Sequence, residues 1–162
     1  REVGEIAIGL GVEVSEFQQF VTKETIEAHG VKVVESDTEM DSIRQYVTVH
    51  IPANDKTKNS INFDLLNKMP KGGVLVNTAR KEVIDEEGLI QLMDTRKDFA
   101  YISVFAPDCK EEIDATFQGR FFFTPKKMGA QTAEANINAG IAGANQIVNY
   151  IKNGDETFRV NK

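Results

Sequence analysis

The chain has 162 residues, 41% of them hydrophobic, and a formal net charge of -6 at pH 7. This length and composition suit one folded domain of ordinary size and exclude disorder throughout. The acidic charge disfavours nucleic acids and anionic membranes as partners, because both attract basic patches. No apolar run in the sequence approaches the roughly 20 residues that span a membrane. The one cysteine, Cys109, indicates a free thiol in a reducing cytoplasm.

The first part of the sequence alternates short helix and strand patterns. The predicted helices cover residues 1–10, 22–30 and 36–44, and the predicted strands cover 12–17, 31–34 and 46–51. Gly11 and Gly30 are the expected stops of the first two helices. His50 and Pro52 come at the carboxyl end of the last of these strands, where Pro52 ends the extended run.

The central stretch is GGVLVNTARKEVIDEEGLI, which begins at Gly72. Its residues 74–76 form a short apolar run that predicts a parallel strand buried on both faces. Thr78, Ala79 and Arg80 follow where ligands bind in open α/β sheets, and an arginine there can hold a carboxylate or phosphate. A short helix capped by Asn62 is predicted before this strand, and a helix over 86–96 capped by Asp85 after it.

The last part of the sequence predicts two further strands, over residues 99–105 and 121–123, and a long helix over 131–154. The apolar stripe of this helix consists of Ile137, Ile141, Ala144, Val148 and Ile151. Alternating strands and helices predict an α/β fold with a doubly wound parallel sheet. We expect one part over residues 1–131 and a C-terminal helix and tail over 132–162.

Three runs carry a resemblance to a known family. GGVLVNTARKEVIDEEGLI resembles the signature of the D-2-hydroxyacid dehydrogenases, and HIPANDKTKNSI extends the likeness. FFFTPKKMGAQTAEANINAG is similar to the phosphoglycerate dehydrogenase branch, in which lysine replaces the usual catalytic histidine. The resemblance implies a Rossmann-like nucleotide-binding domain, NAD as cofactor, a small 2-hydroxy or 2-oxo acid as substrate, a homodimer and no metal.

The resemblance also implies roles for individual residues. Arg80 stands on the substrate-binding catalytic arginine, and Lys127, before Met128, stands on the catalytic histidine. The positions implied to bind the cofactor are Gln18, His50, Pro52, Thr78, Ala79, Arg80, Ser103 and Gly129. In the family the position of Gln18 holds an acidic residue, so a neutral glutamine weakens the expected preference for NAD over its phosphorylated form.

The loop after residues 99–105 allows two alignments with the family. The family has an aspartate that contacts the nicotinamide amide, followed by a catalytic acid. One alignment places Ser103 on the aspartate and Asp108 on the catalytic acid; the other places Val104 on the aspartate and leaves Asp108 one residue short. The alternative interpretation of Asp108 is a turn residue after Pro107.

The glycine-rich phosphate loop G-x-G-x-x-G does not occur in the sequence. We therefore expect a chain that starts just after this loop and the first strand, and that alone neither turns over substrate nor binds NAD tightly. The family also contains transcriptional corepressors that bind NADH. The departures at Gln18 and at Ser103 or Val104 favour such a non-catalytic role as the alternative to a dehydrogenase.

Overall fold

The computed structural model describes residues 2–17, 22–36, 39, 42–125, 129 and 131–161. The chain divides into two compact units, Arg1–Pro125 and Lys126–Lys162. The predicted division between residues 131 and 132 stays a prediction. Within the described ranges no helix combines the length and the apolar character needed to cross a membrane.

The first unit alternates helices and strands along the chain. Its elements are α1 (Glu2–Gly9), β1 (Ser15–Glu16), α2 (Lys23–Glu27), β2 (Lys32–Val33), β3 (Tyr46–Val49), α4 (Phe63–Leu66), β4 (Val74–Asn77), the 3-10 helix η1 (Lys81–Val83), α5 (Glu86–Thr95), β5 (Ala100–Ser103), α6 (Lys110–Thr116) and β6 (Phe121–Phe123). Every predicted strand is present. Four are shorter than their patterns, β4 extends one residue beyond the predicted range 74–76, and β6 has the predicted bounds. Of the helix predicted over 36–44, residues 37, 38, 40 and 41 lie outside the described residues, while 39, 42 and 43 are helical.

Two helical elements escaped sequence prediction. Helix α6 buries one residue, Ile113, so its sequence has no apolar stripe for a periodicity argument to find. The short turn η1 follows Arg80 directly and buries Val83. Both elements are held by contacts with distant parts of the chain, which a local pattern does not record.

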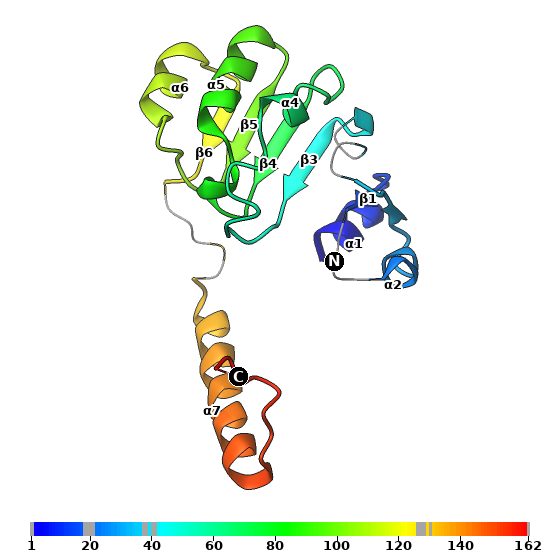
Figure 1. Cartoon of the computed structure of the whole chain (residues 1–162), viewed down its shortest axis with the longest axis vertical. Coiled ribbons are helices and arrows are strands. Elements are labelled where there is room, and N and C mark those ends of the chain that lie inside the picture. The colour runs from blue at the N-terminus through cyan, green and yellow to red at the C-terminus, as the bar shows by residue number, and fades with distance from the viewer. Residues whose placement is uncertain are drawn as a thin grey trace. The chain divides into compact units, whose positions relative to one another are not determined.

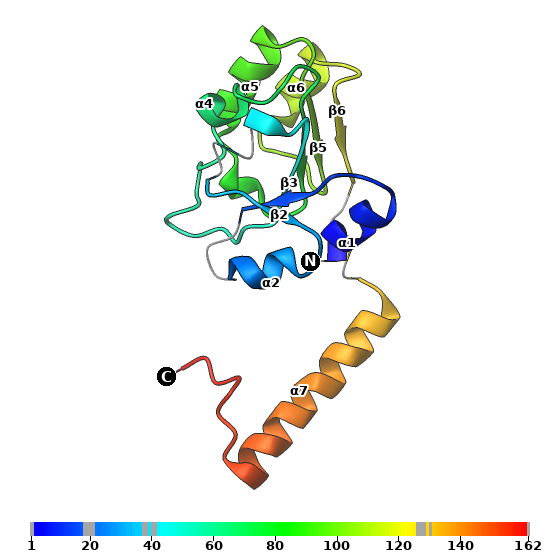
Figure 2. The same ribbon diagram turned by 90° about the vertical axis from the view of Figure 1, so that its right-hand side faces the viewer.

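Every strand pairs in parallel. Strands β1 and β2 form one sheet, and β3, β4, β5 and β6 form a second in that order (Figure 1). The register places Val76 opposite both Thr48 and Ile102. Helices α4, α5 and α6 lie on the same side of the four-stranded sheet in both views (Figures 1 and 2). The arrangement confirms the predicted α/β fold with a Rossmann-like parallel sheet.

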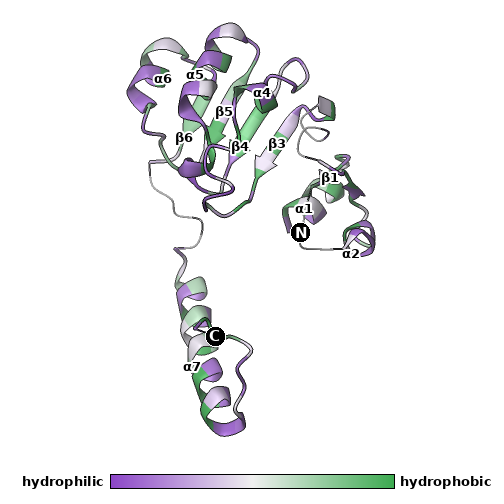
Figure 3. Ribbon diagram, viewed as in Figure 1, coloured by the Kyte–Doolittle hydropathy of each residue, from purple (hydrophilic) through white to green (hydrophobic). Residues whose placement is uncertain are grey.

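The hydrophobic core lies between this sheet and its helices. It includes Leu75 and Tyr101 from the strands and the predicted buried face of α5, Leu89, Leu92 and Met93, all 1% exposed or less. Figure 3 shows the hydrophobic residues gathered in the strands beneath the more polar helices. The same stripe that makes α5 amphipathic therefore joins it to the sheet.

The prediction that the strand over residues 74–76 is buried on both faces is wrong. Val74 and Val76 are half-buried, not fully buried, while Leu75 between them is inaccessible. Ile102 and Phe122 on the neighbouring strands are 37% and 58% exposed. An apolar run of this length indicates a strand but does not reveal whether both of its faces are covered.

Two helix starts use their capping residues differently. Asn62 caps α4 as predicted, since its Oδ1 accepts a hydrogen bond from the Leu65 amide at 3.0 Å. Asp85 occupies the N-cap position of α5 as predicted, yet its side chain makes no capping hydrogen bond. Glu86 and Glu87 still place negative charge in the first turn of α5, where it is stabilising.

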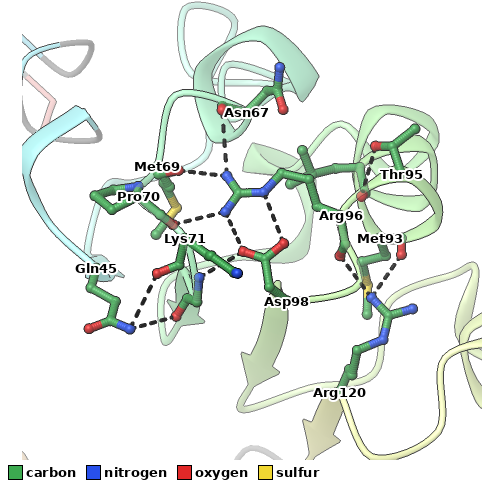
Figure 4. A network of polar contacts seen from close by, with 12 residues as sticks. Gln45, Asn67, Met69, Pro70, Lys71, Met93, Thr95, Arg96, Asp98 and Arg120 are labelled. Atoms are coloured by element: carbon green, nitrogen blue, oxygen red, sulfur yellow. Dashed lines mark hydrogen bonds and ion pairs between the residues drawn. The ribbon is translucent and has the colours of Figure 1, made fainter.

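A polar network joins the amino ends of β4 and β5 (Figure 4). Arg96 donates to the carbonyls of Met69 at 2.6 Å and Pro70 at 2.8 Å, and pairs with Asp98 at 2.6 Å. The Asp98 carboxylate also accepts from the Gly72 amide at 2.7 Å. The network ties the loop before β4 to the loop before β5, at the edge opposite the strands' carboxyl ends.

We expect Arg96→Ala to lower the free energy of unfolding by roughly 3 kcal/mol, because charged hydrogen bonds to half-buried carbonyls and to Asp98 are lost together. The matched control is Lys97→Ala. Its ion pair with Asp94 is exposed, 69% and 67% for the two side chains, so its loss should cost less than about 1 kcal/mol. Urea unfolding of both variants measures the difference, and equal losses would contradict the structural role.

The same network predicts an acid-sensitive contribution to stability. The Arg96 guanidinium, followed by the Gly72 amide, holds the pKa of Asp98 far below its usual range. A lowered carboxyl pKa contributes stability above the unfolded-state pKa of about 3.9, and this contribution is lost as the pH falls below that value. Urea unfolding from pH 6 to pH 3 should therefore show a smaller acid loss in Asp98→Asn than in the wild type.

The second unit contains one long helix, α7 (Ala133–Asn153). Thr132 caps its start by accepting from the Ala135 amide, and Gly154, with a φ of 65°, ends it in the left-handed conformation. These bounds confirm the long helix predicted from the sequence. No residue of α7 is buried, and the predicted stripe is exposed along its length at Ile137, Ile141, Val148 and Ile151.

Candidate active site

A cleft opens where β3 and β4 end. Its volume is about 450 Å³, and it is lined by His50, Ile51, Pro52, Ala53, Thr78, Ala79 and Arg80. The residues come from two segments far apart in the sequence, which the parallel register of β3 and β4 places side by side. The carboxyl ends of strands in an open parallel sheet are the usual ligand-binding edge. Five residues predicted from the sequence, His50, Pro52, Thr78, Ala79 and Arg80, are thus brought together.

The imidazole of His50 bridges two threonines at this edge. Its Nε2 lies 3.1 Å from the Thr48 hydroxyl and its Nδ1 lies 3.1 Å from the Thr78 hydroxyl. The Thr78 hydroxyl also donates to the Val49 carbonyl at 3.3 Å, so the ring supplies the proton at Nδ1. Partial desolvation of the ring lowers the pKa of His50 and so favours the neutral form, in which Nε2 accepts from the Thr48 hydroxyl.

Arg80 is exposed and lines the cleft directly after Ala79. Its Nη1 donates to the Ala79 carbonyl at 2.8 Å. No carboxylate in the described part of the chain forms an ion pair with it. A guanidinium has five N–H donors in a planar fork, which matches the two oxygens of a carboxylate. Arg80 therefore offers an anion-binding group in the lining of the cleft.

Asp108 lies in the loop after β5 and pairs with Lys81, the neighbour of Arg80. Lys81 Nζ lies 2.6 Å from the Asp108 carboxylate, which is 77% exposed. This contact raises the pKa of Lys81. The Glu86 carboxylate accepts from the amides of Asp108 at 2.9 Å and Cys109 at 2.8 Å. Asp108 is thus held by contacts with Lys81 and Glu86, and it is not among the residues that line the cleft.

Three predicted cofactor positions are placed elsewhere or not described. Ser103 is 1% exposed and does not line the cleft; its Oγ accepts from the Phe105 amide at 3.4 Å. Gly129 belongs to the second unit. Gln18 lies outside the described residues, as does the predicted acid/base Lys127.

Cys109 is a free, partly buried cysteine whose thiol is held in the protonated form. Burial, together with Glu86, raises the pKa of its thiol to about 12, so the thiol stays protonated at neutral pH. The described residues contain no group of three or more side chains able to hold a metal ion.

At about 450 Å³ the cleft has room for a small ligand or for part of a larger one. The side chains of Ala53 and Ala79 are small enough for a flat ring to approach the backbone. The neutral His50 ring and the Thr78 hydroxyl provide uncharged polar contacts beside them. Arg80 adds a positive charge that can attract an anion.

Parallel strands with helices along one face, and a cleft at the strands' carboxyl ends, define a nucleotide-binding domain of the Rossmann type. The family described as "D-isomer specific 2-hydroxyacid dehydrogenase, NAD binding domain" matches residues 1–125. The chain belongs to this family. The match confirms the family predicted from the sequence and NAD as its cofactor.

Individual relatives agree with this assignment. The chain is 30% identical over 146 residues to a D-3-phosphoglycerate dehydrogenase of Synechocystis and 31% identical over 152 residues to one of Archaeoglobus fulgidus. These alignments cover 90% and 93% of the chain but 26% and 29% of the relatives. The crystal structure of NAD+-bound 3-phosphoglycerate dehydrogenase from Entamoeba histolytica superposes with a TM-score of 0.88 at 43% identity, over 99% of this chain and 51% of that one.

Proposed function

We propose that the protein is an NAD-dependent dehydrogenase whose substrate pair is 3-phosphoglycerate and 3-phosphohydroxypyruvate. The observation that carries this proposal is the position of Arg80 in the cleft at the carboxyl ends of β3 and β4. The 43% identity with the Entamoeba enzyme supports the choice of substrate within the family. The proposal concerns the protein at its full natural length, since the chain spans about half of that solved relative.

In the oxidative direction the chain's residues have three tasks. Arg80 binds the substrate carboxylate and stabilises the negative charge on the C2 oxygen. Lys127 accepts the hydroxyl proton from that oxygen while the hydride leaves C2, so that a C=O bond replaces the C–H and O–H bonds. His50, Pro52, Thr78 and Ala79 form the cleft wall that orients the reactants. NAD, when bound, supplies the hydride acceptor.

Lys127 must be neutral to accept a proton, although a lysine ordinarily titrates near pH 10.4. A cation beside it, the role that we propose for Arg80, would favour the neutral form, and a carboxylate beside it would oppose that form. Asp108 is the carboxylate that we propose as the acidic partner. Its pairing with Lys81 at 2.6 Å moderates its negative charge and so lessens that opposition.

We expect Asp108→Asn to lower kcat at least about tenfold if Asp108 takes part in proton transfer. The matched control is Lys81→Met, which breaks the same ion pair but leaves the carboxylate in place. An exposed ion pair with no catalytic role contributes little, and both variants would then have the same small effect. Steady-state kinetics of the two variants side by side separates these cases, and equal rates would remove Asp108 from the mechanism.

The test of the proposed function is NADH oxidation with 3-phosphohydroxypyruvate, with pyruvate and glyoxylate as substrates without a phosphate. We expect kcat/KM to be highest for the phosphorylated acid. Turnover with pyruvate or glyoxylate alone would support a dehydrogenase but contradict the proposed phosphorylated substrate. Tight NADH binding without turnover of any 2-oxo acid would contradict the proposed enzymatic function and favour the non-catalytic, NADH-binding alternative.

A further inference from the structure

Asn77 ends β4 and is 0% exposed. Buried polar side chains in native proteins are hydrogen-bonded, and an asparagine at such a position must use its amide within the fold. Its backbone carbonyl is already occupied, since it accepts from the Val104 amide at 3.1 Å. The contacts of the side chain therefore determine what this residue does.

The side-chain amide of Asn77 forms hydrogen bonds with the backbone of the residues that follow it. Asn77 Oδ1 accepts from the Ala79 amide at 3.0 Å, and Nδ2 donates to the Arg80 carbonyl at 2.9 Å. Nδ2 also lies 3.4 Å from the Tyr101 hydroxyl, on the neighbouring strand. The opposite amide orientation would place a donor against the Ala79 N–H and an oxygen against the Arg80 carbonyl, so only one orientation satisfies both contacts.

These two hydrogen bonds hold the backbone of Arg80, from which its side chain extends. Arg80 has an extended backbone, with φ of -150° and ψ of 148°, and leads directly into η1. Its guanidinium donates to the carbonyl of Ala79, the residue whose amide is held by Asn77. An exposed arginine gains little direction from such a contact, so the direction of its side chain depends on the fixed backbone beneath it.

We propose that Asn77 is a positioning residue that aims Arg80 at the substrate carboxylate. This inference rests on the proposed function, because Arg80 is the substrate ligand there. Asparagine is suited to the task because one short amide supplies both the acceptor for Ala79 and the donor for Arg80. Serine has a single, shorter hydroxyl in place of two separate atoms, so it cannot serve both partners as the amide does, and alanine has neither group.

The decisive variants are Asn77→Ser and Asn77→Ala in the full-length protein, each made with Arg80 present and in the Arg80→Ala background. Tyr101→Phe is the matched control, since it removes the weaker contact of Nδ2 and leaves the bond to the Arg80 carbonyl. The measurements are kcat and KM for the 2-oxo acid, the Kd for NADH, and urea unfolding. Asn77→Ser retains a polar group, so it provides the answer if Asn77→Ala does not fold.

A positioning role predicts a specific pattern of results. Asn77→Ser should lower kcat/KM about 10- to 100-fold, the effect of misplacing a binding group by about 1 Å, while Tyr101→Phe stays within about threefold of the wild type. In the Arg80→Ala background the same Asn77→Ser change should alter kcat/KM less than about twofold, because the group that it positions is gone. A merely structural role would lower stability but produce equal losses in both backgrounds, which would overturn the inference.

A crystal structure of the Asn77→Ser variant provides a readout that does not depend on activity. We expect the Arg80 carbonyl and guanidinium to be displaced while β4 and β5 keep their register. If the wild type fails to turn over any 2-oxo acid, the proposed function fails by itself. An Arg80 that remains in place in the variant structure overturns the positioning role whether or not the enzyme is active.

Discussion

Arg80→Ala is expected to lower kcat/KM for 3-phosphohydroxypyruvate by about 10²- to 10³-fold, the usual cost of removing one group that stabilises developing negative charge. Arg80 is the cation that lines the cleft at the carboxyl ends of β3 and β4. NADH affinity should fall much less, since the other cleft residues remain. Stopped-flow turnover and NADH titration by fluorescence measure the two effects separately.

Arg80→Lys is the informative companion to this variant. It keeps the positive charge but replaces the planar, bidentate fork by a single ammonium group. We expect it to regain part of the lost binding and little of kcat, because orientation of the carboxylate determines how the C2 oxygen is presented. Full activity in either variant would remove Arg80 from the catalytic machinery and with it the central argument for this site.

Lys127→Ala is expected to lower kcat by about 10²- to 10⁴-fold, the range of a general acid–base group, while leaving NADH affinity largely intact. The chain offers a matched control in Lys126→Ala, which removes the same charge one residue earlier. Lys127→Arg tests the chemistry more sharply, since arginine keeps the charge but does not give up its proton at accessible pH. We expect it to be as inactive as the alanine variant.

The pH dependence of kcat/KM adds a second readout for Lys127. A general base must be deprotonated, so the wild-type rate of alcohol oxidation should rise with pH through the pKa of Lys127 and then level off. This rise should disappear in Lys127→Ala. An unchanged profile and an unchanged rate in that variant would assign proton transfer to another group.

Much of the fold was predictable because its signals are local. The apolar run at residues 74–76, the stripe of α5 and the cap at Asn62 all correspond to observed elements. Each depends on neighbours within one turn or one strand, which is the range over which periodicity and capping carry information. Helix α6 lacks such a stripe and was missed.

The candidate site was predictable only in part, and the limits have physical causes. The positions of His50 and Arg80 at strand ends could be predicted from strand patterns, but their convergence depends on the β3–β4 register. Asn77 appeared in the sequence only as a polar residue ending a strand. The feature that distinguishes it, hydrogen bonds to Ala79 and Arg80 within a sealed interior, exists only after the chain has folded.

The sequence by itself determined the type and order of every element except η1 and α6, the α/β class and the arginine available to bind an acid, because composition, periodicity and capping act over a few residues. The tertiary structure alone decided that Asp108 pairs with Lys81, that Ser103 is buried, and that Asn77 holds the backbone of Arg80. The pair of Asp108 and Lys81 joins two segments 27 residues apart in the sequence. The hydrogen bonds of Asn77 are local, but its burial and that of Ser103 depend on the neighbouring strands. Sheet register decides that burial, and it cannot be read from neighbours along the chain.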